Sequence, residues 1–179
     1  MKNVKRLFEI KPALDLLRSK IGDSEFGYRM QAFFAHVLLE LGGSIIEINQ
    51  QGHPDIKSKI NGCISHFQVK TISHSAAGWN LTIGPDDIAG IRPRISDEVG
   101  YFAVLDCAVP ISWLIIEYSQ IQRHESRSVS IETIRAAMDA DFSNECTDVF
   151  AELVMKHKDK LHLLTYGILC KRALLGEGL

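Results

Sequence analysis

The stretch GHPDIKSKINGCISHFQVKTIS, residues 52–73, carries the strongest local signal for the fold. Two runs that alternate apolar and polar residues flank the dipeptide Asn61-Gly62, which is typical of a two-residue hairpin turn. With this turn, Ile60 faces Cys63, and every other pairing along the two strands follows. The sequence therefore predicts an antiparallel hairpin with a defined register.

The predicted register brings three polar side chains together at one end of the hairpin. Asp55 lies opposite Gln68, and directly opposed residues project to the same face of a sheet. Lys70 follows Gln68 by two positions and therefore shares that face. A carboxylate, an amide and an amine are thus expected to lie side by side.

The two faces of the hairpin differ in character. Most of the apolar bulk lies on one face and every charged residue on the other: Ile56, Ile60, Cys63, Phe67 and Val69 against Asp55, Lys57, Lys59, His66, Gln68 and Lys70. The same alternation is typical of an antiparallel hairpin with one face on the core and one in water. The polar face is therefore either a solvated surface or a functional site.

The chemistry of the polar face suits metal-dependent hydrolysis of a phosphodiester. A bound metal polarises the phosphate and deprotonates water near neutral pH. Mg²⁺ prefers oxygen ligands and keeps several waters, so Asp55, the amide oxygen of Gln68 and the carbonyl of Val69 are candidate ligands, with Mn²⁺ as a substitute. Lys70 is suited to orient the attacking water or to stabilise charge that develops on the phosphate.

Two helices are predicted before the hairpin. Residues 25–43 form the clearest one, with a broad apolar stripe and a Gly-Gly pair at its end. Asp23 or Ser24 is expected to cap it. Residues 4–17 also show helical spacing, and Pro12 is expected to start a new helix within them.

The remaining segments complete a mixed α/β pattern. Strands are expected at 44–50, 79–83, 100–109 and 112–121, a helix at 84–95, and further helices over 130–140 and 144–175. Strands interrupted by one helix and followed by helices fit an α/β fold with a mixed central sheet flanked by helices.

Bulk properties limit the class of protein. The 179 residues, 46% of them hydrophobic, suit one globular domain over 1–179. A formal net charge of -2 means that any attraction to phosphate must come from a local face. The four cysteines form no CxxC pair, and no apolar run suits a signal peptide or a membrane span. We therefore expect a soluble cytoplasmic protein with free thiols.

The pair Pro54-Asp55, followed after the hairpin by the tripeptide QVK at 68–70, resembles the motif of the PD-(D/E)xK nuclease superfamily. The preceding helix, and the order helix, three strands, helix, strand, also resemble that family's restriction-endonuclease-like core. The similarity covers residues 24–120 and leaves 125–179 as a helical extension. It implies a Mg²⁺-dependent DNA endonuclease, a hydrolase in which Asp55, Gln68 and Lys70 are catalytic.

One departure from the motif concerns the acidic ligands. The family usually has Asp or Glu at the place of Gln68, although some branches carry Gln. A second carboxylate is expected from the first helix, where Glu25 is the candidate; a first-turn Glu also suits the helix dipole alone. The family's helical Glu often follows a Gly by four positions, which here is Gln31.

Contacts to DNA phosphates are expected from side chains near the motif strands, and Arg suits bidentate phosphate contacts. The candidates are Lys57, His66, Ser73, Arg92 and Arg94. The alternative for His66, favoured over a phosphate contact, is an exposed structural histidine, and the alternative for Ser73 is a plain loop serine.

Three functions are compatible with these patterns. The first is a restriction-type endonuclease that cuts double-stranded DNA as a homodimer, since a two-fold symmetric protein matches a duplex. The second is a structure-selective nuclease of repair or recombination, which would use backbone and shape contacts. The third is a non-catalytic DNA-binding module, suggested by the neutral Gln68.

Overall fold

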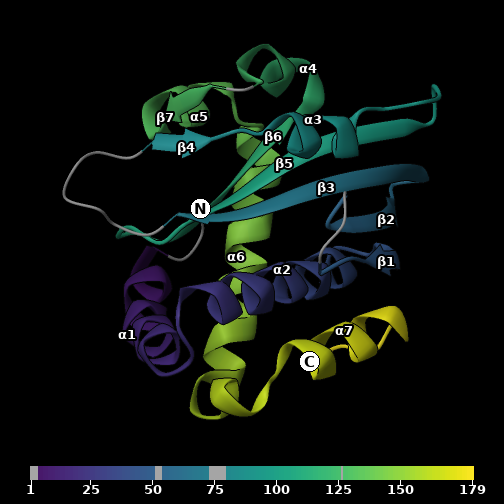
Figure 1. Cartoon of the computed structure of the whole chain (residues 1–179). Helices are drawn as coiled ribbons and strands as arrows, with labels where there is room; N and C mark the ends of the chain where they lie inside the picture. Colours follow the sequence, from purple (N-terminus) through teal and green to yellow (C-terminus); the bar gives the residue numbers. More distant parts are fainter. Residues whose placement is uncertain (1–3, 51–53, 73–79, 126) are drawn as a thin grey trace.

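The computed structural model describes residues 4–50, 54–72, 80–125 and 127–179. Its centre is a mixed five-stranded sheet in the order β1-β2-β3-β5-β6 (Figure 1). The strands are β1 Ser44–Ile48, β2 Ile56–Ile60, β3 Cys63–Ile72, β5 Glu98–Asp106 and β6 Ser112–Glu117. Strands β3 and β5 are parallel, whereas the other neighbours are antiparallel. Two short strands, β4 Asn80–Thr82 and β7 Ser128–Ser130, pair separately.

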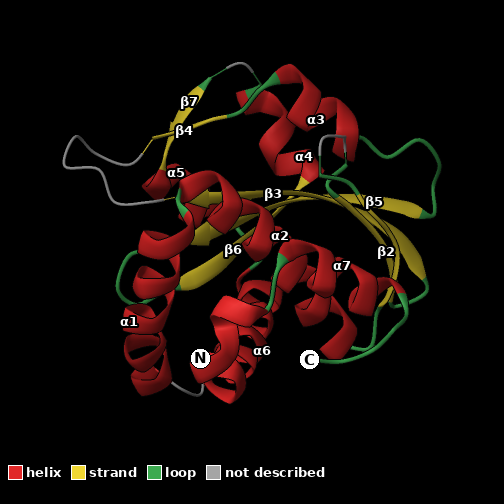
Figure 2. Ribbon diagram, turned by 60° about the horizontal axis from the view of Figure 1, so that its bottom comes forward, coloured by secondary structure: helices red, strands yellow, loops and turns green. Residues whose placement is uncertain are grey.

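Helices cover both faces of this sheet. They are α1 Val4–Ile21, α2 Asp23–Glu40, α3 Pro85–Ile91, α4 Tyr118–Ile121, α5 Ile131–Ala137, α6 Ala140–His157 and α7 Tyr166–Leu174, with 3-10 turns η1 Gln122–His124 and η2 Lys158–Leu163. Figure 2 shows α1, α2, α6 and α7 on one side of the sheet and α3 and α4 on the other. The expected α/β class and the mixed, helix-flanked sheet are confirmed. None of the described helices is long and apolar enough to cross a membrane.

The hairpin has the register that its turn predicts. Ile60 pairs with Cys63, and the ladder runs on to Ile56 and Phe67. Asn61 and Gly62 have φ of 50° and 85°, the left-handed pair of values that a tight hairpin turn needs and that Asn and Gly tolerate best. Because the turn forms as expected, each residue of β3 lies opposite the residue of β2 that the sequence predicts.

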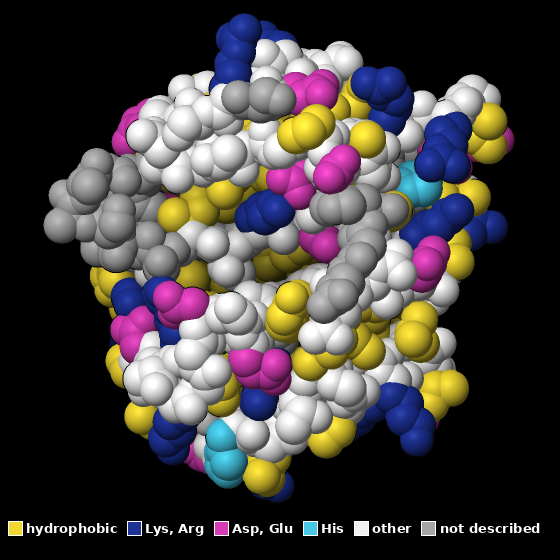
Figure 3. Space-filling view, in the orientation of Figure 1, with side chains coloured by type: hydrophobic (Ala, Val, Ile, Leu, Met, Phe, Trp, Pro, Cys, Tyr) yellow, Lys and Arg dark blue, Asp and Glu magenta, His cyan; other side chains and the backbone are white. Residues whose placement is uncertain are grey.

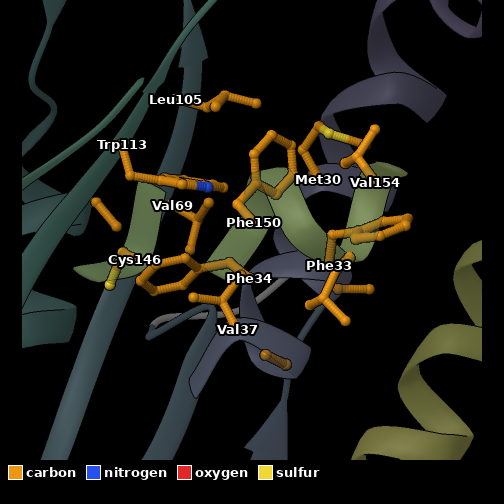
Figure 4. Packing of buried hydrophobic residues seen from close by; sticks show 14 of the residues in the cluster. Met30, Phe33, Phe34, Val37, Val69, Leu105, Trp113, Cys146, Phe150 and Val154 are labelled. Atoms are coloured by element: carbon orange, nitrogen blue, oxygen red, sulfur yellow. The ribbon is translucent and has the colours of Figure 1, made fainter. Parts of the chain in front are cut away.

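The main core fills the space between the sheet and α1, α2, α6 and α7. Phe34 of α2 lies 4.5 Å from Trp113 of β6 and 5.4 Å from Phe67 of β3, measured between ring centroids (Figure 4). Phe150 of α6 packs edge-on against Trp113 at 5.8 Å and Phe33 at 6.2 Å. Helices α6 and α7 therefore contribute side chains to the same core as α2.

The polar face of the hairpin is covered by protein, so the solvated interpretation is wrong for β3. His66 and Gln68 are buried, although Lys59 of β2 is exposed. In parallel pairing with β5, Gln68 lies beside Phe102 and Lys70 beside Val104. These apolar neighbours belong to a second core formed with α3, α4, α5 and β6, which a single hairpin cannot reveal.

Several local expectations need correction. Pro12 lies inside the continuous helix α1 and starts no new helix. The backbone carbonyl that loses its donor belongs to Phe8, whose side chain is half exposed, so water can replace the missing bond. Neither Asp23 nor Ser24 caps α2, because the N-cap residue is Gly22 and Asp23 is instead paired with Arg18.

The strand expected over residues 112–121 ends early, since 118–121 form helix α4, and strand β7 was missed because it has only three residues. Trp113 is fully buried as a core residue, whereas Trp79 lies outside the described residues. The four cysteines are free thiols, as expected.

We expect the folded protein to lose stability in mild acid, because the side chain of His36 is buried. Its Nε2 lies 2.9 Å from the carbonyl oxygen of Leu169 in α7, and burial lowers its pKa from 6.5 to about 4. The unfolded chain takes up this proton at higher pH than the fold does. The free energy of unfolding should therefore fall by roughly 2–3 kcal/mol between about pH 6.5 and pH 4.

Urea unfolding across that pH range checks this prediction with the variant His36→Gln. Its amide can still donate to Leu169 but does not titrate, so most of the acid loss should disappear. An unchanged pH dependence in the variant would assign the effect to other groups.

Candidate active site

A cavity of about 410 Å³ lies between helix α2 and strand β3. Figure 3 shows a hollow at this place, with basic and acidic side chains along its edge. Four residues that the sequence assigned to the site line the cavity, namely Asp55, Gln68, Val69 and Lys70. The first half of α2 forms the opposite wall.

Asp55 is held by both neighbouring strands. It lies immediately before β2, is only 8% exposed, and its Oδ2 accepts a hydrogen bond from the backbone N–H of Val69 at 2.7 Å. Its own carbonyl accepts from the backbone N–H of Asn49 at 2.8 Å. The backbone pairing of β2 with β3 ends at Ile56. Beyond it, the side-chain carboxylate of Asp55 bonds across the hairpin to the backbone of β3.

Lys70 and Gln68 stand on the same face of β3 but differ in environment. Gln68 is 2% exposed, whereas the Lys70 side chain is 33% exposed, at the mouth of the cavity. The Lys70 Nζ lies 2.8 Å from Asp87 Oδ1 in α3. Asp87 is the residue that sequence reasoning missed, since the order Pro85, Asp86, Asp87 indicates only acids at a helix start.

The second carboxylate expected from α2 takes another place. Glu25 accepts a hydrogen bond from Arg29 at 2.8 Å and is not among the lining residues. Gln31 lines the cavity instead, at the position one helical turn after Gly27. Its Nε2 donates to the carbonyls of Asn49 at 2.7 Å and Asp55 at 3.2 Å, so α2 also fixes the backbone at Asp55.

The oxygen atoms that line the cavity are of the kind that a hard cation binds, but together they carry little negative charge. The cavity offers carboxylate, amide and carbonyl oxygens, which Mg²⁺ and Mn²⁺ accept. Within the described ranges, no group of three or more His, Cys, Asp or Glu could hold a metal. A cation at Asp55 would therefore rely on neutral oxygens and water, and its affinity should be low.

Three of the residues expected to contact DNA phosphates, Lys57, His66 and Arg94, lie around Glu98 and outside the cavity. Lys57 is half-buried and Arg94 is exposed, whereas Arg92 is exposed but donates to the Tyr118 hydroxyl at 3.0 Å. His66 is buried 3.4 Å from Glu98 Oε1, and burial lowers its pKa although Glu98 opposes the shift. Ser73 lies outside the described residues.

Searches of family models, curated proteins and solved structures found no match to this chain. Its function is therefore inferred from the geometry and chemistry of the cavity between α2 and β3.

Proposed function

We propose that the protein is a Mg²⁺-dependent deoxyribonuclease of the restriction type, a cytoplasmic hydrolase that cuts double-stranded DNA as a homodimer. One observation carries the proposal: Asp55, Gln68, Val69 and Lys70 line one cavity, although Val69 follows Asp55 by 14 positions in the sequence. A carboxylate and two neutral oxygen donors can bind Mg²⁺ together with water, and an ammonium can stabilise charge that develops on a phosphate.

The arrangement of elements supports the same proposal. Helix α2, strands β1 to β3, helix α3 and strand β5 follow one another in the order of the restriction-endonuclease-like core, with β4 inserted before α3. The proposed catalytic residues lie on or beside the β2–β3 hairpin, where the motif of that family lies.

The protein's own residues have distinct tasks in this proposal. The backbone N–H of Val69 donates to one carboxylate oxygen of Asp55 and orients this side chain. The position of the carboxylate therefore does not depend on a bound ligand. Lys70, partly exposed at the cavity, approaches a phosphate oxygen or the attacking water. Bound Mg²⁺ would supply Lewis acidity and a more acidic water molecule.

A plasmid digest tests the proposal directly. Supercoiled plasmid is incubated with the protein and Mg²⁺ or Mn²⁺, and we expect discrete linear fragments. Lys70→Ala should lower the cleavage rate by about a hundredfold, the usual effect of losing one group that stabilises charge in the transition state. Lys59→Ala is the matched control, because Lys59 is exposed on the same hairpin outside the cavity.

The proposed active site would be contradicted if the Lys70→Ala variant cut plasmid as fast as the wild type. Cleavage confined to branched DNA would favour a structure-selective nuclease over a restriction enzyme.

The low charge of the donor set favours one further candidate, a DNA-binding module without turnover. Asp55 and Asp23 are the only acids among the described residues that line the cavity, and Asp23 is paired with Arg18 at 2.6 Å. Retained binding of duplex DNA without cutting, in either metal, would support this candidate.

A further inference from the structure

The charges that line the cavity nearly cancel. Asp23 is neutralised by Arg18, which leaves the carboxylate of Asp55 and the ammonium of Lys70 on either side of the uncharged Gln68. A divalent cation that enters would be attracted by one charge and repelled by the other. Opposite charges so close to a site offset each other's field, so these two alone would give little attraction.

A further carboxylate, that of Asp87, offsets the positive charge of Lys70 from outside the cavity. Its side chain is 9% exposed, and its Oδ1 lies 2.8 Å from Lys70 Nζ. Its Oδ2 accepts the backbone N–H of Gly84 at 3.0 Å, so both oxygens are fixed. Asp87 itself is not among the residues that line the cavity, and it reaches the site only through Lys70.

We infer that Asp87 is the counter-charge of the site: by pairing with Lys70 it weakens the repulsion of that ammonium toward a cation beside Asp55, and so lets the cavity attract a divalent cation. The inference rests on the metal-dependent activity proposed above and concerns what the chain does before DNA arrives. Asp87 is therefore a positioning residue, because it acts through the ammonium of Lys70. Its helix α3 packs in the second core through Ile88 and Ile91.

The charge arrangement predicts the sign of three changes in cation affinity. Asp87→Asn leaves Lys70 uncompensated and should weaken Mn²⁺ binding by about three- to tenfold. Lys70→Met removes the repulsion and should strengthen binding by a similar factor. The double variant should bind close to the wild-type level, because it removes one positive and one negative charge together.

Isothermal titration calorimetry of the full chain with Mn²⁺ measures these affinities without DNA. Asparagine retains the oxygen that accepts from Gly84, so the start of α3 is kept. Asp86→Asn is the matched control, since Asp86 is an exposed neighbour on the same helix, and it should leave the affinity unchanged. Circular dichroism confirms that each variant is folded.

Each outcome has a clear consequence. Equal Mn²⁺ affinity in Asp87→Asn and wild type would overturn the inference. A double variant that binds no better than Asp87→Asn would also overturn it, because removal of Lys70 would then restore nothing and the role of Asp87 would be purely structural. Failure of the wild type to bind Mn²⁺ would overturn the inference and the proposed function together. The predicted order of affinities without any DNA cleavage would support the counter-charge and reject the nuclease.

Discussion

Replacing Asp55 with asparagine should reduce DNA cleavage by about a hundredfold or more while leaving the fold intact. The substitution removes the negative charge that would hold the cation, but asparagine retains an oxygen that can accept the N–H of Val69. Because the carboxylate is only 8% exposed and links β2 to β3, alanine would confuse a catalytic effect with a structural one. The rate of plasmid linearisation, at saturating Mg²⁺, measures the effect.

Asp23→Asn is the matched control for this experiment. Asp23 lines the same cavity, but its carboxylate lies 2.6 Å from Arg18 and is exposed. We expect its loss to change the rate little. Comparable losses in both variants would show that cleavage depends on the general charge of the cavity and would remove Asp55 from its assigned role.

Gly100→Ala should destabilise the fold by about 3 kcal/mol or more. A Cβ at this position of β5 would lie 1.7 Å from the carbonyl oxygen of Ile91 and 3.2 Å from Cβ of Tyr118. The first of these atoms is backbone at the end of α3, so relief requires the helix to move as a whole. Chemical unfolding, monitored by circular dichroism, measures the change in the free energy of unfolding.

The same substitution at Gly167 provides the control with the opposite sign. Gly167 lies in helix α7, and a Cβ there would meet nothing within 4 Å. Alanine should stabilise the protein by about 0.5–1 kcal/mol, since it restricts the unfolded chain and suits a helix. A neutral Gly100→Ala variant would mean that α3 does not pack on β5 as closely as described.

The Asp87→Asn and Gly100→Ala substitutions affect opposite ends of helix α3. At its start, Asp87 contacts Lys70, and at its end the carbonyl of Ile91 lies against Gly100. A shift of α3 away from β5 would therefore also disturb the Lys70–Asp87 pair. We expect a destabilised Gly100→Ala variant to show weaker cation binding even where it remains folded.

Local chemistry was enough to predict the hairpin and helix α2. Asn61 and Gly62 favour the left-handed backbone values of the turn, and this turn sets which residues of β2 lie opposite those of β3. The apolar stripe of α2 likewise predicts its buried side before any partner is known. Both features depend on residues within a few positions of each other, which is why sequence patterns report them.

The sequence by itself thus determined the turn, the register and the shared face of Gln68 and Lys70. Only the tertiary structure decided what covers that face, because the parallel pairing of β3 with β5 joins segments 34 residues apart along the chain and places α3 above them. That packing placed Gln31 at the cavity, where Glu25 was expected. It also brought Asp87 into contact with Lys70. Contacts between distant segments depend on how whole helices and sheets bury their apolar faces, and no local pattern of residues encodes them.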